Sequence, residues 1–263
     1  MKSLYIFFGI IFTFSFSFAE KPAYRIFDIE GDETDYEEMA EDASDAKIIF
    51  LGELFETDGQ LIIDEYLSGK IPQSNFEKEA RLWNNYETDY KPLLEFANEN
   101  GLDFIATNIP RRYAAFVARN GLEALEEFSP EARQYFAPLP VEVDLSLECY
   151  AAMDDMMGGI HGKNKKDAKP GSMKDINEKM KDLSPEEKKA KMKKMMQAMK
   201  KLQYFKEAQA VKDATMSFFI LANMDEDKTF LHYNGTYHTN NHEGIVWFIK
   251  RDAPRYDVLT IAS

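Results

Sequence analysis

Residues 47–60 read KIIFLGELFETDGQ, and the expected architecture depends on this stretch. Four apolar residues at 48–51 run directly into Gly52-Glu53, which is typical of a buried strand that ends in a carboxylate. In open α/β sheets, ligands bind at the carboxyl ends of such strands. The chain then enters FETDG at 55–59 at once, a sequence typical of the start of a helix from another part of the fold.

Strands and helices are predicted to alternate along the rest of the chain. Further strands are expected at 24–28, 102–107, 229–233 and 257–261, and helices at 34–43, 58–69, 74–83, 88–100, 111–120, 184–223 and 243–250. Alternation of this kind predicts an α/β fold, with a mostly parallel sheet flanked by helices.

The first residues have the pattern of a secretory signal. Residues 1–3 (MKS) are a short basic start, 4–16 are almost unbroken apolar sequence, and SFA at 17–19 offers a cleavage site. We therefore expect residues 1–19 to be removed after Ala19, leaving one domain at 20–263. The alternative is a membrane anchor, but the apolar run falls short of the roughly 20 residues that span a bilayer.

Composition favours an exported protein of a bacterial periplasm or cell surface. The single cysteine, Cys149, allows no internal disulfide, which fits that compartment better than a small secreted scaffold. Formal net charge is −14, yet residues 163–212 contain 16 Lys against 7 Asp and Glu. This basic segment is interpreted as a solvated helix face, with an interaction surface as the alternative. An acidic exported chain is not expected to bind nucleic acid.

Residues 158–225 are predicted to form a lid, a flexible loop followed by a long helix. Gly-Gly at 158–159 and Pro-Gly at 170–171 mark the loop, and SPEE at 184–187 is a capping box that opens the helix. A methionine stripe at helical spacing between 192 and 199 is interpreted as core, with an adaptable ligand pocket as the alternative.

Polar side chains follow the predicted strands. Glu53 and Asn108 come directly after two of them, and His238 lies in the loop after the strand at 229–233. If the strands are parallel, these residues meet on one rim of the sheet with Arg111 and Tyr237. The alternative is that His238 only fastens a turn.

Four stretches resemble the ChaN-like haem-binding uptake family: NNYETDYKPL at 84–93, FIATNIPRRY at 104–113, AQAVKDATM at 208–216 and HYNGTYHTNNHEGI at 232–245. The resemblance covers roughly residues 40–262. The family is similar to the wider Tiki superfamily, which includes metal-dependent peptidases and erythromycin-esterase-like enzymes. A pair of Gly-x-x-His motifs at strand ends marks that superfamily.

The resemblance implies that an internal segment is absent. GTYH at 235–238 supplies the second Gly-x-x-His motif, whereas GEL at 52–54 is followed by Phe55 in place of His. In the family, a His-bearing loop, a helix and a strand come next and lead into a stretch like FETD at 55–58. One helix and one strand are therefore missing between Leu54 and Phe55, unless the chain is a divergent member with a rearranged site. An unpaired strand edge there would favour a homodimer.

The resemblance further implies an exported protein that binds haem for iron uptake, with an outer-membrane haem receptor as partner. Tyr237 and His238 are the expected iron ligands, with Tyr233 and His161 as further candidates, because haem iron accepts Tyr and His. Arg111 and Arg112 would pair with the propionates. The whole expected binding set is Glu53, Asn108, Arg111, Arg112, Tyr233, Tyr237 and His238.

Two other functions stay open. A metal-dependent hydrolase of the Tiki superfamily needs two His and a carboxylate around a divalent metal. With the first motif's His missing, only Glu53, His238 and His242 remain nearby, so catalysis is not expected. The third interpretation is a nonfunctional or regulatory remnant of the family.

Overall fold

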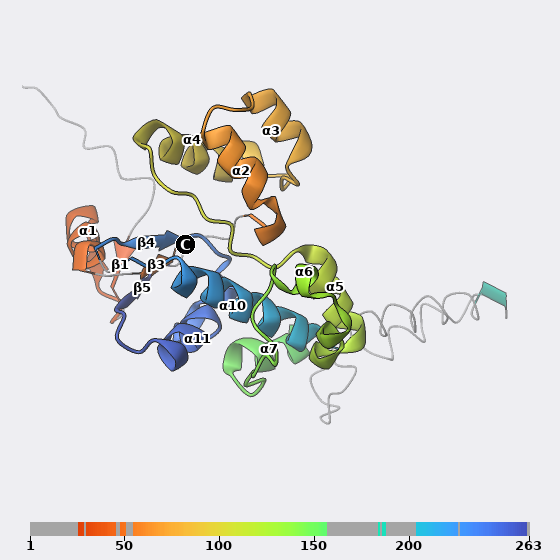
Figure 1. The fold of residues 1–263 in the computed structure, drawn as a ribbon. Helices are drawn as coiled ribbons and strands as arrows, with labels where there is room; N and C mark the ends of the chain where they lie inside the picture. Colours follow the sequence, from red (N-terminus) through yellow and green to blue (C-terminus); the bar gives the residue numbers. More distant parts are fainter. Residues whose placement is uncertain are drawn as a thin grey trace, which may run out of the picture. The chain divides into compact units, whose positions relative to one another are not determined.

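In a computed structural model of the chain, three short strands form a parallel sheet (Figure 1). β3 (Ile48–Phe50) lies in the centre, with β4 (Phe230–His232) on one side and β5 (Val258–Thr260) on the other. Both pairings are parallel, so the carboxyl ends of the strands share one edge of the sheet. The strands predicted at 229–233 and 257–261 are confirmed at 230–232 and 258–260, the described part of the strand predicted at 47–53 is confirmed at 48–50, and all three are parallel.

The structure describes residues 26–28, 30–45, 48–50, 55–156, 184, 186–187, 204–225 and 227–261, without side chains for 42–50 and 154–156. The expected signal at 1–19, the loop at 158–183 and the methionine stripe lie outside these residues, as do Glu53 and His161. The chain divides into two units, residues 1–42 and 43–263. In the first, β1 (Ile26–Phe27) pairs antiparallel with β2 (Glu33–Thr34), and α1 (Tyr36–Asp45) follows.

The described residues are mostly helical and contain few, short strands, so the sheet is smaller than the sequence suggests. The remaining helical segments are η1 (Thr57–Gly59), α2 (Gln60–Leu67), α3 (Gln73–Glu79), η2 (Tyr86–Tyr90), α4 (Lys91–Asn100), α5 (Arg111–Asn120), η3 (Leu122–Glu127), α6 (Pro130–Arg133), α7 (Glu148–Met156), α10 (Phe205–Ala222), η4 (Thr236–His238), η5 (Asn240–His242) and α11 (Ile245–Asp252).

One predicted strand is wrong. Residues 102–107 form no strand. The next residue, Asn108, forms an isolated parallel bridge with Glu56. A strand forms only where a neighbour accepts and supplies its backbone hydrogen bonds. The apolar run at 102–107 has the composition of a strand, but within the described residues it lacks such a neighbour.

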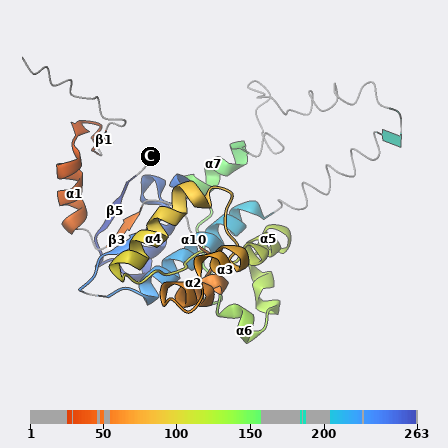
Figure 2. The same cartoon turned by 90° about the horizontal axis from the view of Figure 1, so that it is seen from above.

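Helix α10 lies at the centre of the second unit. It packs against α5, α7 and α11, and Figures 1 and 2 show it running beside α5 and α11. Met216 and Ile220 form one hydrophobic cluster with α11, against which Phe230 of β4 and Val258 of β5 pack. Helices α2, α3 and α4 share a separate cluster around Phe76, and we call these three helices the helical lobe.

Candidate functional site: a polar rim at the sheet's carboxyl edge

Buried polar residues gather at the carboxyl edge of the sheet. Glu56 stands opposite Asn108 in a backbone bridge, Thr107 bonds to His232 and His232 to Asn234, and His238 and Tyr150 both bond to Asp213. All of these side chains are buried. We call this set the polar rim. Buried polar groups need hydrogen-bond partners, and the side chains of Thr107, His232, Asn234, His238, Asp213 and Tyr150 supply them to one another.

His232 connects the end of β4 to residues 102–107. Its Nε2 lies 2.7 Å from the Thr107 hydroxyl, and its Nδ1 lies 3.3 Å from Asn234 Oδ1. The Asn234 amide donates hydrogen bonds to Thr239 Oγ1 (3.1 Å) and to the Gly235 carbonyl (2.9 Å), which fastens the loop after β4. Burial lowers the pKa of His232 to about 4, so this imidazole is neutral at pH 7.

His238 is held by a buried carboxylate. Its Nδ1 contacts Asp213 of α10, and the hydroxyl of Tyr150 donates a hydrogen bond of 2.6 Å to the other oxygen of the same carboxylate. Asp213 is 1% exposed and His238 is 8% exposed. Burial, the largest effect, and the negative charge of Asp213 raise the pKa of Tyr150, so its phenol stays protonated and keeps donating.

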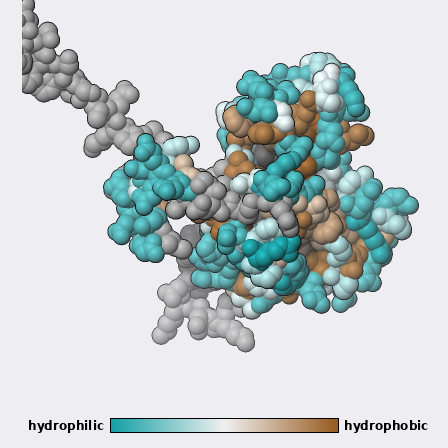
Figure 3. Space-filling model, turned by 60° about the vertical axis from the view of Figure 1, so that its left-hand side comes forward, coloured by the Kyte–Doolittle hydropathy of each residue, from teal (hydrophilic) through white to brown (hydrophobic). Residues whose placement is uncertain are grey.

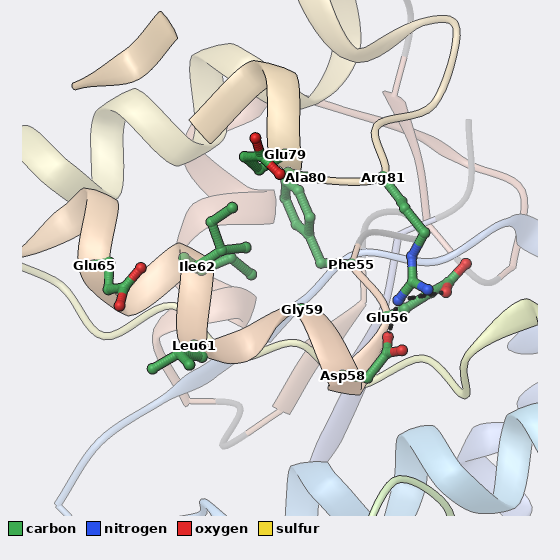
Figure 4. A pocket seen from close by; sticks show the side chains of 11 residues that line it. Phe55, Glu56, Asp58, Gly59, Leu61, Ile62, Glu65, Glu79, Ala80 and Arg81 are labelled. Atoms are coloured by element: carbon green, nitrogen blue, oxygen red, sulfur yellow. Dashed lines mark hydrogen bonds and ion pairs between the residues drawn. The ribbon is translucent and has the colours of Figure 1, made fainter. Parts of the chain in front are cut away.

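The rim residue Glu56 and the neighbouring Asp58 form a cluster with three arginines. Glu56 pairs with Arg111 and lies 3.3 Å from Arg81, and Asp58 pairs with Arg81 and Arg112. Figure 4 shows Arg81 pointing between the two carboxylates, next to a cavity of about 460 Å³. Burial would raise the pKa of Asp58, but the hydrogen bonds and charges of Arg81 and Arg112 outweigh it and hold that pKa below its usual value.

The family follows from a comparison with known proteins. A model of the family described as haem-binding uptake, Tiki superfamily, ChaN matches residues 35–249. The chain belongs to this family. A solved structure, "Cofacial heme binding to ChaN of Campylobacter jejuni", is similar with a TM-score of 0.54 and 16% identity, over 89% of this chain and 87% of that one. At this identity the likeness shows the fold. No curated protein matches the chain.

Not all of the residues predicted for a ChaN-like site are equally accessible. Asn108 and His238 are buried parts of the polar rim, whereas the side chains of Arg111 and Arg112 are half exposed and paired with carboxylates. Tyr237 is 53% exposed, and Tyr233 is partly buried, which raises its pKa. Among the described residues, no group of three or more His, Cys, Asp and Glu side chains could hold a metal ion.

Sequence reasoning missed the residues that hold the predicted ones. Asp213 fixes His238, and Glu56 accepts a hydrogen bond from Arg111. The backbone of Phe55 and Thr57 on either side of Glu56 holds that of Asn108. A signal for Asp213 does exist: it is a lone acidic residue among Ala208, Ala210, Val211 and Ala214 on the buried face of a helix. A carboxylate in such a position needs a buried partner. No comparable sequence pattern predicts that Tyr150 bonds to Asp213.

Proposed function

We propose that this ChaN-family chain binds haem on the outer side of the polar rim, with Tyr237 as the iron ligand. The supporting observation is the contrast between two neighbours in the same motif. Tyr237 is exposed, while His238 is buried and its Nδ1 is engaged by Asp213. A phenolate is an established axial ligand of haem iron, so the accessible residue is the better candidate.

An exposed ligand also suits the way in which haem binds to a structural relative. In the similar Campylobacter jejuni structure, haem binds cofacially to ChaN. Haems that stack face to face each need one open face, which an enclosed pocket does not leave. Tyr233 is the second candidate, but burial raises its pKa and so disfavours the phenolate that binds ferric iron.

The arginine cluster suits the haem propionates. Among the described residues, Arg81, Arg111 and Arg112 form ion pairs with Glu56 and Asp58, so these five side chains together carry one positive charge in excess. The guanidinium groups of Arg111 and Arg112 are half exposed, and a guanidinium can form further hydrogen bonds with a second carboxylate.

Export and iron uptake belong to the same proposal. The N-terminal sequence favours secretion to a periplasm or cell surface, where haem would be passed to or from an outer-membrane receptor. Among the described residues, no helix is both long and apolar enough to cross a bilayer. The alternative of a metal-dependent hydrolase would use Glu53, His238 and His242, and Glu53 lies outside the described residues.

A haem titration followed by absorbance tests the proposal. We expect saturable binding by the natural chain and at least a tenfold loss of affinity, about 1.4 kcal/mol, for Tyr237→Phe. Tyr36→Phe is the matched control, because Tyr36 is similarly exposed (62%) but lies in the N-terminal unit. Unchanged affinity in Tyr237→Phe together with a loss in Tyr233→Phe would move the ligand to Tyr233. The absence of saturable binding by the natural chain would reject haem binding altogether.

A further inference from the structure

A cavity of about 930 Å³ lies between β4 and the apolar stretch at 102–107. Its lining brings together two hydrophobic clusters: Phe104 packs against the cluster of the helical lobe, whereas Met224 and Phe230 pack against the cluster of α10 and α11. Volumes of about 300–1,000 Å³ are usual for pockets that bind small molecules. We call this space the β4 cavity, and it has the size of a ligand site.

Two polar contacts join the walls of the β4 cavity. At one end the Thr107 hydroxyl lies 2.7 Å from His232 Nε2, and at the other end Lys228 Nζ lies 3.3 Å from Asp103 Oδ2. All four residues line the cavity. A polypeptide segment that ran along β4 would have to pass both contacts, whereas a small molecule that lies between them would not.

Neighbouring elements hold both walls in place. Gln60 of α2, which does not line the cavity, donates a hydrogen bond from Nε2 to the Phe104 carbonyl (2.9 Å) and accepts one from Ala106 N (2.7 Å). On the other wall, β4 is paired with β3 along its whole length. Because the fold fixes both walls, binding in the cavity requires little ordering of the protein, and such pre-organisation favours affinity.

The charge of the lining is concentrated at one end of the cavity. Asp225, Asp227 and Lys228 precede β4 and line this end. Asp103 lies on the other wall, so three carboxylates and one ammonium group leave an excess of two negative charges. At the opposite end His232 is neutral at pH 7, because burial lowers its pKa to about 4. The cavity is therefore acidic at the amino end of β4 and uncharged at its carboxyl end.

We propose that the β4 cavity binds an amphiphilic cation, a small molecule with an apolar body and an ammonium or similar cationic group. The apolar body lies against Phe96, Leu102 and Leu231, which line the cavity and are 59%, 50% and 46% exposed. Figure 3 shows hydrophobic residues exposed on the helical lobe, to which Phe96 belongs. The cationic group lies beside the exposed carboxylates of Asp225 and Asp227, where an excess of negative charge favours it.

The charge of the cavity argues against two other occupants. A second copy of the chain, bound through the same surface, would bring two acidic ends close together, and like charges across an interface are unfavourable. A fatty acid would add a further carboxylate to an end that already has three. This inference does not rest on haem binding, because the cavity is lined by residues other than Tyr237 and the arginine cluster.

Calorimetric titration of the full chain with decyltrimethylammonium, at concentrations below micelle formation, tests the proposal. We expect saturable binding with a negative heat-capacity change, which marks the burial of apolar surface. Decanoate, which has a tail of similar length and the opposite charge, should bind at least tenfold more weakly. Octyltrimethylammonium should bind about tenfold more weakly than the decyl compound, because two fewer methylene groups are buried.

Variants of the lining test the two parts of the ligand separately. Leu231→Asn should weaken binding of decyltrimethylammonium at least fivefold, whereas Leu61→Asn should not, because Leu61 is exposed (71%) but lines a different cavity. The double variant Asp225→Asn/Asp227→Asn should reduce the preference for decyltrimethylammonium over decanoate at least fivefold. Glu99→Gln is its control and should keep the preference, since Glu99 is exposed on α4 but does not line the cavity.

Three results would overturn the proposal: no saturable binding of decyltrimethylammonium, equal affinity for decanoate, or unchanged affinity in Leu231→Asn. A dimer in sedimentation that Leu231→Asn dissociates, while no cation binds, would overturn it as well, because a second copy of the chain would then occupy the cavity.

Discussion

At the scale of single residues, His232 makes the stability of the chain depend on pH. Burial lowers its pKa from 6.5 to about 4, so the folded state favours the neutral imidazole. The stabilisation is therefore complete above pH 6.5 and is lost as the pH falls towards 4. A difference of this size corresponds to roughly 3 kcal/mol in the free energy of unfolding.

We predict that the natural chain loses about 2 kcal/mol of this free energy between pH 6.5 and 5, as measured by urea denaturation. The variant His232→Gln should lose much less over the same interval, because the titrating group is absent. His242→Gln is the control, since His242 is exposed at the end of η5, and this variant should keep the natural slope. Equal slopes for His232→Gln and the natural chain would contradict the prediction.

Asp213 is the residue on which the Gly-x-x-His motif of this chain depends. It is almost fully buried and receives hydrogen bonds from both His238 and Tyr150. Asp213→Asn keeps the shape but removes the charge, and we expect the free energy of unfolding to fall by about 2–4 kcal/mol. Asp252→Asn, at an exposed ion pair with Arg251, should change it by less than about 0.5 kcal/mol. If Asp213→Asn and Asp252→Asn changed the free energy of unfolding by similar amounts, the buried hydrogen bonds of Asp213 would not be important for stability.

At the scale of elements, the turn between η5 and α11 requires a glycine. Gly244 has φ +57°, and a Cβ added there would lie 2.3 Å from the carbonyl oxygen of His238. We expect Gly244→Ala to lower the free energy of unfolding by about 3 kcal/mol, since strain and collision act together. Gly59→Ala is the matched control, because φ at Gly59 is −95° and no atom lies within 4 Å of the added Cβ. If both variants melted alike, the turn would not need Gly244.

The same scale shows where sequence reasoning succeeds and where it fails. The strands at 48–50, 230–232 and 258–260 could be predicted because short apolar runs bounded by polar residues find partners in the sheet. Residues 102–107 have the same pattern but no strand neighbour among the described residues. The composition of a segment does not show whether a neighbouring strand is present, so this difference could not be predicted. The rim residues that follow strands could be predicted from position, whereas Tyr150 comes from a distant helix and could not.

At the scale of the whole molecule, the family resemblance leads us to expect a missing part of the sheet. The join between Leu54 and Phe55 suggests a lost helix and strand, and among the described residues the stretch after this join forms one isolated parallel bridge, between Glu56 and Asn108. The apolar surface uncovered by such a loss would be of the order of 300 Å². At roughly 25 cal/mol per Å² this corresponds to about 7 kcal/mol, which is comparable to the whole stability of a domain.

We therefore predict that the natural chain is weakly stable or self-associates, and that a relative's His-bearing loop, helix and strand inserted between Leu54 and Phe55 would correct this. The insertion should raise the melting temperature by at least about 5 °C, since each kcal/mol shifts it by about 2–4 °C in a chain of this size. It should also raise haem affinity. A Gly/Ser insertion of equal length should do neither. If the natural chain is already monomeric, melts cooperatively at high temperature and binds haem as tightly as the restored one, then no structural unit is missing.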